Sequence, residues 1–304
     1  MGLRNFAMCT ADGWRGRRTG RTNARGAGMS FKLKFWGVRG SIACPSAKYI
    51  MFGGNTSCVE VACGGRRIIF DAGTGIRNLG HWLLKKDCKE AFLMLSHTHW
   101  DHITGFPFFT PAYRKDCSFE IMAGHLDASK GGIRGVLASQ MSQPTFPVPI
   151  EVMAAKLNFS DFKAGESFTL GRNINIKTTP LNHPDNATGY RVEYNGKAMC
   201  YVTDTEHVVG KPDDKVLALI EGADLVIYDS TYTDKEFPGK IGWGHSTWQE
   251  GIRLCQQANV KRLAIFHHDP DHEDLFMEHL ESEARFLWEG ATVARENMRL
   301  YLAT

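Results

Sequence analysis

From residue 31 onward, apolar residues occur in short segments separated by turns rich in glycine and asparagine. Short apolar or alternating segments of this kind predict β-strands. The predicted strands cover residues 31–38, 58–63, 67–70, 91–95, 119–123, 174–179, 190–194, 198–202, 223–228, 262–266 and 298–302. Apolar residues at helical spacing predict helices over 75–86, 247–258 and 271–288. Strands followed by helices, twice along the chain, predict two sheets with helices on their outer faces.

Two dipeptides predict tight hairpin turns. Gly64-Gly65 and Asn195-Gly196 each lie between two predicted strands. Glycine and asparagine favour such turns because they readily adopt the positive φ angles that the turn positions require.

Six apolar segments end in aspartate or histidine. The residues at or just after these ends are Asp71, His97, His183, Asp204, Asp229 and His267. Strand ends on a rigid sheet can converge on one point, where proteins built from strands and helices commonly place their sites. The pattern therefore predicts one site assembled from several strand ends.

The densest group of metal-binding residue types is the segment 97–102, His-Thr-His-Trp-Asp-His. Its three imidazoles and one carboxylate suit zinc and related divalent ions. The spacing is too tight to place all four side chains on one ion, so it predicts two neighbouring ions, about 3.5–4 Å apart, of the kind that drive hydrolysis. Chance histidines in a surface turn are the alternative, but they would leave His183, Asp204 and His267 unexplained.

The first 29 residues differ from the rest of the chain in charge. They hold six arginines and one acidic residue, Asp12, whereas the remainder keeps 30 of the 36 basic and 32 of the 33 acidic residues, a net charge of −2. We expect residues 1–29 to be a disordered Arg/Gly-rich tail or to precede a true start at Met29, with a transit peptide as the alternative. The catalytic domain is expected to span 30–304. Its nearly neutral charge attracts long polyanions only weakly.

Cysteine usage and apolar patterning indicate the cellular context. The eight cysteines form no CxxC pair, which predicts free thiols in a reducing compartment and hence a cytoplasmic protein. No apolar segment is long enough to span a membrane, so no membrane partner is expected.

The spacing His97-x-His99-x-Asp101-His102 resembles the metal-binding motif of the metallo-β-lactamase superfamily. An Asp-Ala-Gly-Thr-Gly segment precedes it at 71–75, and His, Asp and His follow downstream in the superfamily's order. The resemblance implies an α+β fold, a four-layer αβ/βα sandwich with the metal site at the edge of its two sheets.

Carried over by position, the resemblance implies seven ligands. His97, His99 and His183 hold one ion, Asp101, His102 and His267 hold the other, and Asp204 bridges both. Asp71 is expected to orient the histidine segment from behind. Zinc is the default metal, and manganese or iron could use the same ligands. His268 is the alternative to His267, which directly follows the apolar segment.

The segment 244–247, Gly-His-Ser-Thr, resembles the tRNA 3′-processing endonuclease (tRNase Z) branch and its cyclic phosphodiesterase relatives. In that branch a carboxylate and a histidine protonate the leaving oxygen, which implies this role for Asp229 and His245, while Asp101 positions the attacking hydroxide. The family often has glutamate where this chain has Asp229. The alternative for His245 is a capping or packing residue at the start of the helix 247–258.

Other segments resemble a bacterial subgroup grouped with phosphoribosyl and nucleotide cyclic phosphodiesterases. They lie at 35–41, 53–57, 105–109 and 242–245. The tRNase Z enzymes carry a long Gly/Pro-tipped arm that grips tRNA, whereas the candidate insertion here, 127–151, is short and apolar and predicts a lid or a homodimer surface.

We therefore expect a phosphoric diester hydrolase that acts on a small cyclic or nucleotide phosphodiester, with nucleic acid as a less favoured partner. The alternatives are a tRNA 3′ endonuclease, a thioester or lactone hydrolase of the same fold, and a non-enzymatic binding module.

Overall fold

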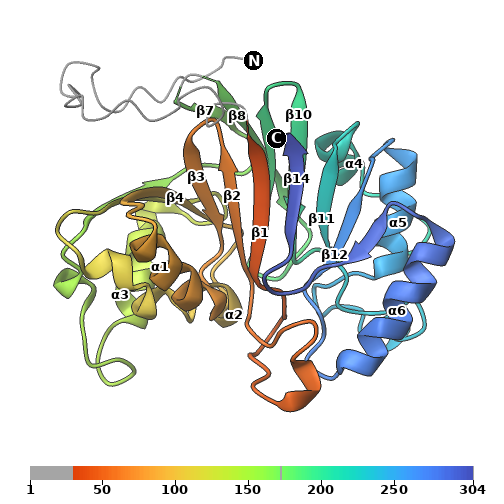
Figure 1. Cartoon of the computed structure of the whole chain (residues 1–304), viewed down its shortest axis with the longest axis horizontal. Helices are drawn as coiled ribbons and strands as arrows, with labels where there is room; N and C mark the ends of the chain where they lie inside the picture. Colours follow the sequence, from red (N-terminus) through yellow and green to blue (C-terminus); the bar gives the residue numbers. More distant parts are fainter. Residues whose placement is uncertain (1–29, 172, 304) are drawn as a thin grey trace.

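Two mixed β-sheets form the centre of the computed structural model, which describes residues 30–171 and 173–303 (Figure 1). The first sheet has the strand order β14 (Arg299–Ala303), β1 (Phe31–Gly37), β2 (Cys58–Cys63), β3 (Arg66–Phe70), β4 (Glu90–Leu95), β5 (Ser118–Ala123) and β6 (Lys156–Asp161). The second has the order β13 (Ala291–Val293), β12 (Leu263–Phe266), β11 (Leu225–Asp229), β10 (Lys197–Val202), β9 (Ala187–Tyr194), β8 (Ile174–Leu181) and β7 (Ser167–Leu170). The predicted tail, 1–29, lies outside the described residues.

Helices cover the outer face of each sheet (Figure 1). On the first sheet lie α1 (Gly75–Lys85) and α3 (Gly132–Gln140), and the short α2 (Trp100–Ile103) follows β4. On the second sheet lie α4 (Asp214–Ile220), α5 (Trp248–Gln257) and α6 (Asp274–Leu287). Short 3-10 helices occupy the connections at Ala47–Tyr49, Phe106–Phe108, Thr110–Tyr113, Ala128–Lys130, Ile150–Val152 and Phe237–Gly239. The predicted four-layer αβ/βα sandwich is confirmed.

Aromatic side chains fill the space between the two sheets. Phe70 of β3 packs against Tyr190 of β9 and Tyr201 of β10, with ring centroids 5.3 and 5.0 Å apart. Phe35 of β1 meets Phe266 of β12 at 5.9 Å. All five side chains are fully buried, so this layer joins the sheets through a large apolar contact and fixes their relative position.

The parallel halves of the two sheets bring the polar strand ends to one edge. β3, β4 and β5 pair in parallel in the first sheet, as do β10, β11 and β12 in the second. The chain turns sharply after three of these strands, because Asp71, Asp204 and His267 have positive φ angles of 60°, 54° and 62°. Residues other than glycine seldom adopt such angles, and where they do the surrounding structure must stabilise them.

Both predicted hairpins are present. Gly64 and Gly65 link β2 to β3 with φ of 55° and 73°, and Asn195 and Gly196 link β9 to β10 with φ of 52° and 72°. The predicted strands and helices are also present, with small changes at their ends.

Besides the short α2 and the 3-10 helices, the sequence pattern missed five elements: β6, β7, β13, α3 and α4. β6 and β7 are edge strands. β6 has no fully buried residue and so needs no strong apolar alternation, and β7 alternates but is only four residues long. α4 is only seven residues long and depends on a local cap, in which the Asp213 carboxylate accepts hydrogen bonds from Lys215 N and Val216 N.

The apolar insertion at 127–151 contains α3. Ile133, Leu137 and Met141 are at most 1% exposed and pack with the outer face of the first sheet. Core packing therefore explains much of the apolar character that suggested a lid or a dimer surface, and the homodimer stays a prediction.

Two expectations from composition can be compared with the described residues. Each of the seven cysteines in them is free, as predicted, and six are buried. Over the same residues, no helix combines the length and apolarity that crossing a membrane requires.

Candidate metal centre

Three histidines form the first set of donors, here called the outer group: His97 and His99, which follow β4, and His183, which follows β8. Their ligand atoms lie within 4.8 Å of one another. His183 Nε2 is 3.0 Å from His99 Nδ1. The side chain of His99 is 41% exposed, so the outer group opens to solvent on this side.

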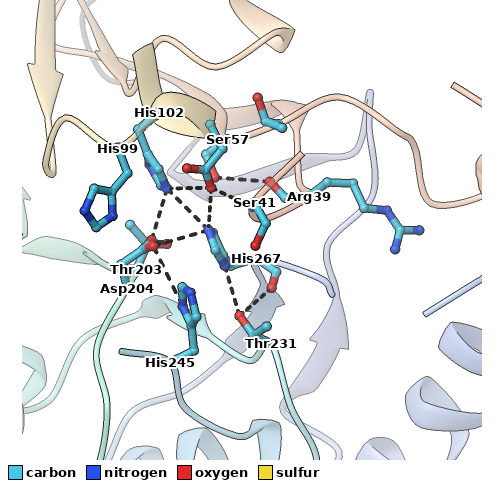
Figure 2. A network of polar contacts seen from close by, with 12 residues as sticks. Arg39, Ser41, Ser57, His99, His102, Thr203, Asp204, Thr231, His245 and His267 are labelled. Carbon is cyan, nitrogen blue, oxygen red and sulfur yellow. Dashed lines mark hydrogen bonds and ion pairs between the residues drawn. The ribbon is translucent and has the colours of Figure 1, made fainter. Parts of the chain in front are cut away.

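Four buried side chains form the second set, here called the inner group: Asp101 and His102 of α2, Asp204 after β10, and His267 after β12. His267 Nε2 lies 3.2 Å from Asp101 Oδ2. It also lies 3.3 Å from Asp204 Oδ1 (Figure 2). His102 Nε2 lies 3.2 Å from Asp204 Oδ2. Asp204 Oδ1 is also 3.7 Å from His97 Nε2, so this carboxylate lies between the two groups.

Two of these side chains, His97 and Asp204, have pKa values that suit metal binding. Burial lowers the pKa of His97 well below its ordinary value, and its buried Nε2 has no hydrogen-bond partner among the described residues. Burial alone would raise the pKa of Asp204, but His102 and His267 outweigh it and hold that pKa well below the ordinary value. Metal coordination requires neutral imidazole and ionised carboxylate, and an unpartnered buried nitrogen costs free energy unless a ligand satisfies it.

The two groups together fit two divalent ions. They contain imidazole nitrogens and carboxylate oxygens only, the donors that zinc, manganese and iron share. All seven predicted ligands lie in these groups, and Asp204 Oδ1 lies 3.7 Å from His97 Nε2 and 3.3 Å from His267 Nε2, between the two.

Asp71 lies behind the inner group. Its Oδ2 accepts hydrogen bonds from Tyr201 Oη at 2.7 Å and Ser96 Oγ at 2.8 Å, and it is 2.8 Å from His102 Nδ1. The contact with Nδ1 leaves His102 Nε2 directed at the other donors. Carboxylates in this position fix the ring and raise the basicity of a metal-binding histidine.

Other supporting contacts could not be assigned from the sequence. Thr231 Oγ1 lies 2.9 Å from His267 Nδ1 (Figure 2). Ser41 N donates a hydrogen bond to Asp101 Oδ2 at 2.7 Å. The nearness of Thr231 to Asp229, two residues earlier in the chain, is the one local signal for its role.

Gly244 supports the outer group through its backbone. Its carbonyl oxygen lies 2.7 Å from His183 Nδ1, which fixes that ring. Gly244 has φ of 84°, and a Cβ at this position would lie 2.4 Å from His183 Nδ1. Only glycine fits this place without displacing the histidine.

His245 and Asp229 form a hydrogen-bonded pair beside the inner group. His245 Nδ1 lies 3.0 Å from Asp229 Oδ2, and the His245 ring stacks on His267 with centroids 4.8 Å apart. Burial opposes protonation of His245, but Asp229, with help from Asp204, outweighs it and raises the pKa of His245 to about 9. Thr247, rather than His245, caps α5, since its hydroxyl accepts a hydrogen bond from Glu250 N.

Residues 66–268 match the beta-lactamase superfamily domain. The chain belongs to the metallo-β-lactamase superfamily. Among its relatives in this superfamily, ribonuclease Z of Natronomonas pharaonis is 24% identical over 278 residues, which cover 79% of this chain and 87% of that protein. Ribonuclease Z of Haloarcula marismortui is 23% identical over 309 residues, covering 88% and 96%. The family and these relatives place the chain among the superfamily's hydrolases.

Solved structures share the superfamily fold. The short form of human tRNase Z superimposes with a TM-score of 0.63 at 19% identity, covering 88% of this chain and 98% of that one. A diphosphatase from the PhnP family gives a TM-score of 0.65 at 17% identity, covering 90% and 98%. Zinc-bound PqqB from Methylobacterium extorquens gives a TM-score of 0.65 at 17% identity, covering 88% of this chain and 99% of that one. At these identities the likeness concerns the fold alone.

The structure separates His267 from its neighbour His268. His267 lies in the inner group, whereas His268 Nε2 is 2.8 Å from the carbonyl oxygen of Ala294 and its ring belongs to none of the donor groups. The geometry thus supports the preference for His267 as the last ligand.

Proposed function

We propose that this superfamily member is a dinuclear metal phosphodiesterase that acts on a small cyclic or nucleotide phosphodiester. The observation that carries the proposal is the His245–Asp229 pair, which lies beside the inner group with a nitrogen–oxygen distance of 3.0 Å. An alkoxide leaving group needs a proton, and an imidazole held by a carboxylate can deliver one.

His97, His99, His183, Asp101, His102, Asp204 and His267 would hold the two ions. Bound zinc, manganese or iron would supply an activated water and stabilise negative charge on the phosphoryl oxygens.

The protein's own residues orient the reactants and move protons. Asp101 and Asp204 orient the attacking water, whose oxygen forms a new bond to phosphorus and whose proton passes to Asp101. The bond from phosphorus to the leaving oxygen breaks, and that oxygen takes a proton from His245. Asp229 holds His245 Nδ1, so Nε2 is the nitrogen that can donate. The cycle is complete when His245 takes up a proton from solvent and Asp101 releases its proton to solvent.

Two features support a small substrate. The chain without residues 1–29 has a net charge of −2, which gives little attraction for a long polyanion. The candidate insertion, 127–151, contains α3, whose buried residues pack on the first sheet and are unavailable to a long substrate.

A tRNA 3′-processing endonuclease is the second candidate. The ribonuclease Z relatives, which match most of this chain at 23–24% identity, favour it. For this candidate the substrate would be a precursor tRNA with a 3′ extension, and the same residues would perform the cleavage.

A substrate panel tests both candidates. The full chain, loaded with zinc or manganese, is incubated with cyclic mononucleotides, cyclic dinucleotides, bis-p-nitrophenyl phosphate, a 3′-extended precursor tRNA and a thioester. Hydrolysis of a small nucleotide diester with higher kcat/KM than the tRNA is the expected result. Cleavage of the precursor tRNA alone would contradict the small substrate and favour the tRNA endonuclease. Hydrolysis of the thioester alone would exclude a phosphodiesterase.

A further inference from the structure

The segment that leads into His245 carries an exposed indole. Trp243 is 60% exposed. Among the residues that the structure describes, the one charged or aromatic partner found for its ring is Lys240, whose Nζ lies 4.2 Å from the ring centroid. A single exposed tryptophan is common on a protein surface, and what distinguishes Trp243 is its position two residues before His245.

A series of contacts links this indole to the proton donor. Lys240 Nζ also lies 5.4 Å from the centroid of the Tyr232 ring, and that ring lies 6.0 Å from the ring of His245. Tyr232 is 3% exposed, whereas Trp243 faces solvent. Through Tyr232, the ring of His245 is thus connected with Lys240 and with the exposed indole of Trp243.

The loop that presents Trp243 is held on both sides. Gly242 N and Gly244 N donate hydrogen bonds to Glu206 Oε2 at 2.7 and 2.8 Å. Trp243 N donates to Lys240 O at 3.1 Å. These contacts preorganise the loop, so little conformational freedom is lost when a ligand covers the indole.

The two side chains suit a nucleotide. Within the described residues, Lys240 forms no ion pair with a carboxylate, and its ammonium group lies against one tryptophan ring and one tyrosine ring. A tryptophan with solvent on one face stacks readily on a nucleobase, and a cation beside it favours an anionic ligand.

We propose that Trp243 and Lys240 form the binding subsite for the leaving fragment, and that this fragment is a nucleoside or nucleotide whose base stacks on Trp243. Lys240 positions the indole and provides positive charge near the fragment. The inference rests on the proposed function, because it takes His245 as the proton donor. It narrows the substrate class to phosphodiesters whose leaving oxygen belongs to a second, base-bearing group, such as linear or cyclic dinucleotides.

Two substrates with the same phosphoryl fragment test the subsite. One is a diadenosine dinucleotide with a single phosphodiester, whose leaving group is adenosine, and the other is the methyl ester of adenosine monophosphate, whose leaving group is methanol. Trp243→Ala should raise KM for the dinucleotide by about ten-fold or more, in line with the loss of one base–aromatic stack, and change the methyl ester little. Trp243→Phe should retain most of the affinity, and Lys240→Ala should give a smaller loss in the same direction.

Phe286→Ala is the matched control, because Phe286 is 91% exposed on α6 and contacts neither donor group. It should leave both substrates unchanged. Calorimetric titration with adenosine adds a readout independent of turnover, in which Trp243→Ala should weaken binding about ten-fold.

The outcomes separate this inference from the proposed function. Equal effects of Trp243→Ala on both substrates, or unchanged adenosine affinity, would overturn the subsite while the phosphodiesterase stands. If the unaltered protein hydrolyses cyclic mononucleotides but neither of these two esters, the subsite is wrong while the phosphodiesterase stands. Failure to hydrolyse any phosphodiester, the substrate panel included, would overturn the proposed function and the subsite with it.

Discussion

The inner and outer donor groups are supported in different ways. In the inner group, His102 is held by Asp71, and His267 by Thr231, through side chains that are all at most 1% exposed. In the outer group, the side chain of His99 is 41% exposed, and its carboxylate neighbour, Asp185, lies 3.7 Å away with a side chain that is 94% exposed.

This difference indicates that the two groups have different roles. Buried, fully partnered networks hold ligands rigidly, whereas exposed contacts are weakened by solvent. We therefore expect the inner group to bind its ion more tightly and the outer group to control access of water and substrate.

The largest effect is expected at the carboxylate between the groups. Asp204→Ala should remove a donor from both and lower kcat/KM by about 10³-fold or more. Metal analysis of the purified variant should find fewer than one ion per chain. Asp185→Ala is the control carboxylate, and its metal content should equal that of the unaltered protein. Two tightly bound ions in Asp204→Ala would contradict the shared role.

His245 lies beside both groups and is expected to contribute through proton transfer. His245→Ala should lower turnover by about 10²–10⁴-fold on a diester with an alkyl leaving group. The loss should be much smaller with p-nitrophenolate, which needs no proton to leave. Asp229→Asn should show the same selectivity more weakly, because it removes the partner rather than the imidazole. Equal losses on both leaving groups would exclude the general-acid role.

Asp71 tests whether the inner group depends on its buried partner. Asp71→Asn should weaken the affinity of the inner ion by about 10–100-fold, since the amide no longer holds His102 as a carboxylate does. Competition with a chelator measures this affinity. Tyr201→Phe removes one hydrogen bond to Asp71 and leaves the carboxylate, so it should weaken the affinity of the inner ion less than Asp71→Asn does. It should lower the free energy of unfolding by about 1 kcal/mol. If Asp71→Asn leaves the affinity of the inner ion unchanged, the inner group does not need this support.

The smallest effect is expected from the backbone that supports the outer group. Gly244→Ala places a Cβ against His183 and should weaken the outer ion while the inner ion stays bound. Gly196→Ala is a matched control, because Gly196 also has positive φ but a Cβ there would meet nothing within 4 Å. Both substitutions should lower the free energy of unfolding by about 1–2 kcal/mol, and only Gly244→Ala should change metal affinity. Equal metal affinities in the two variants would show that the backbone of Gly244 does not support His183 as a ligand.

Much of the candidate centre was predictable because its ligands belong to strong local patterns. His97, His99 and His102 lie within six residues, and Asp204 and His267 directly follow apolar strands. The supporting residues were not predictable in this way. Gly244 meets His183 from 61 positions away, and nothing local to either residue specifies that contact.

The two adjacent histidines show where sequence reasoning ends. His267 and His268 follow the same strand, and their residue type offers no distinction. The φ of 62° at His267 turns the chain at this point, so that one ring enters the inner group while the other bonds to the carbonyl of Ala294.

The sequence by itself determined which chemical groups are available and the order of the elements that carry them, because apolar spacing and turn residues act over a few positions. Only the tertiary structure decided how those groups meet. The packing of Phe70 against Tyr190 and Tyr201 fixes one sheet on the other, and that placement sets the distances among Asp101, Asp204 and His267. Such distances depend on contacts between segments that are far apart in the sequence. The spacing of residue types along the chain does not specify those contacts.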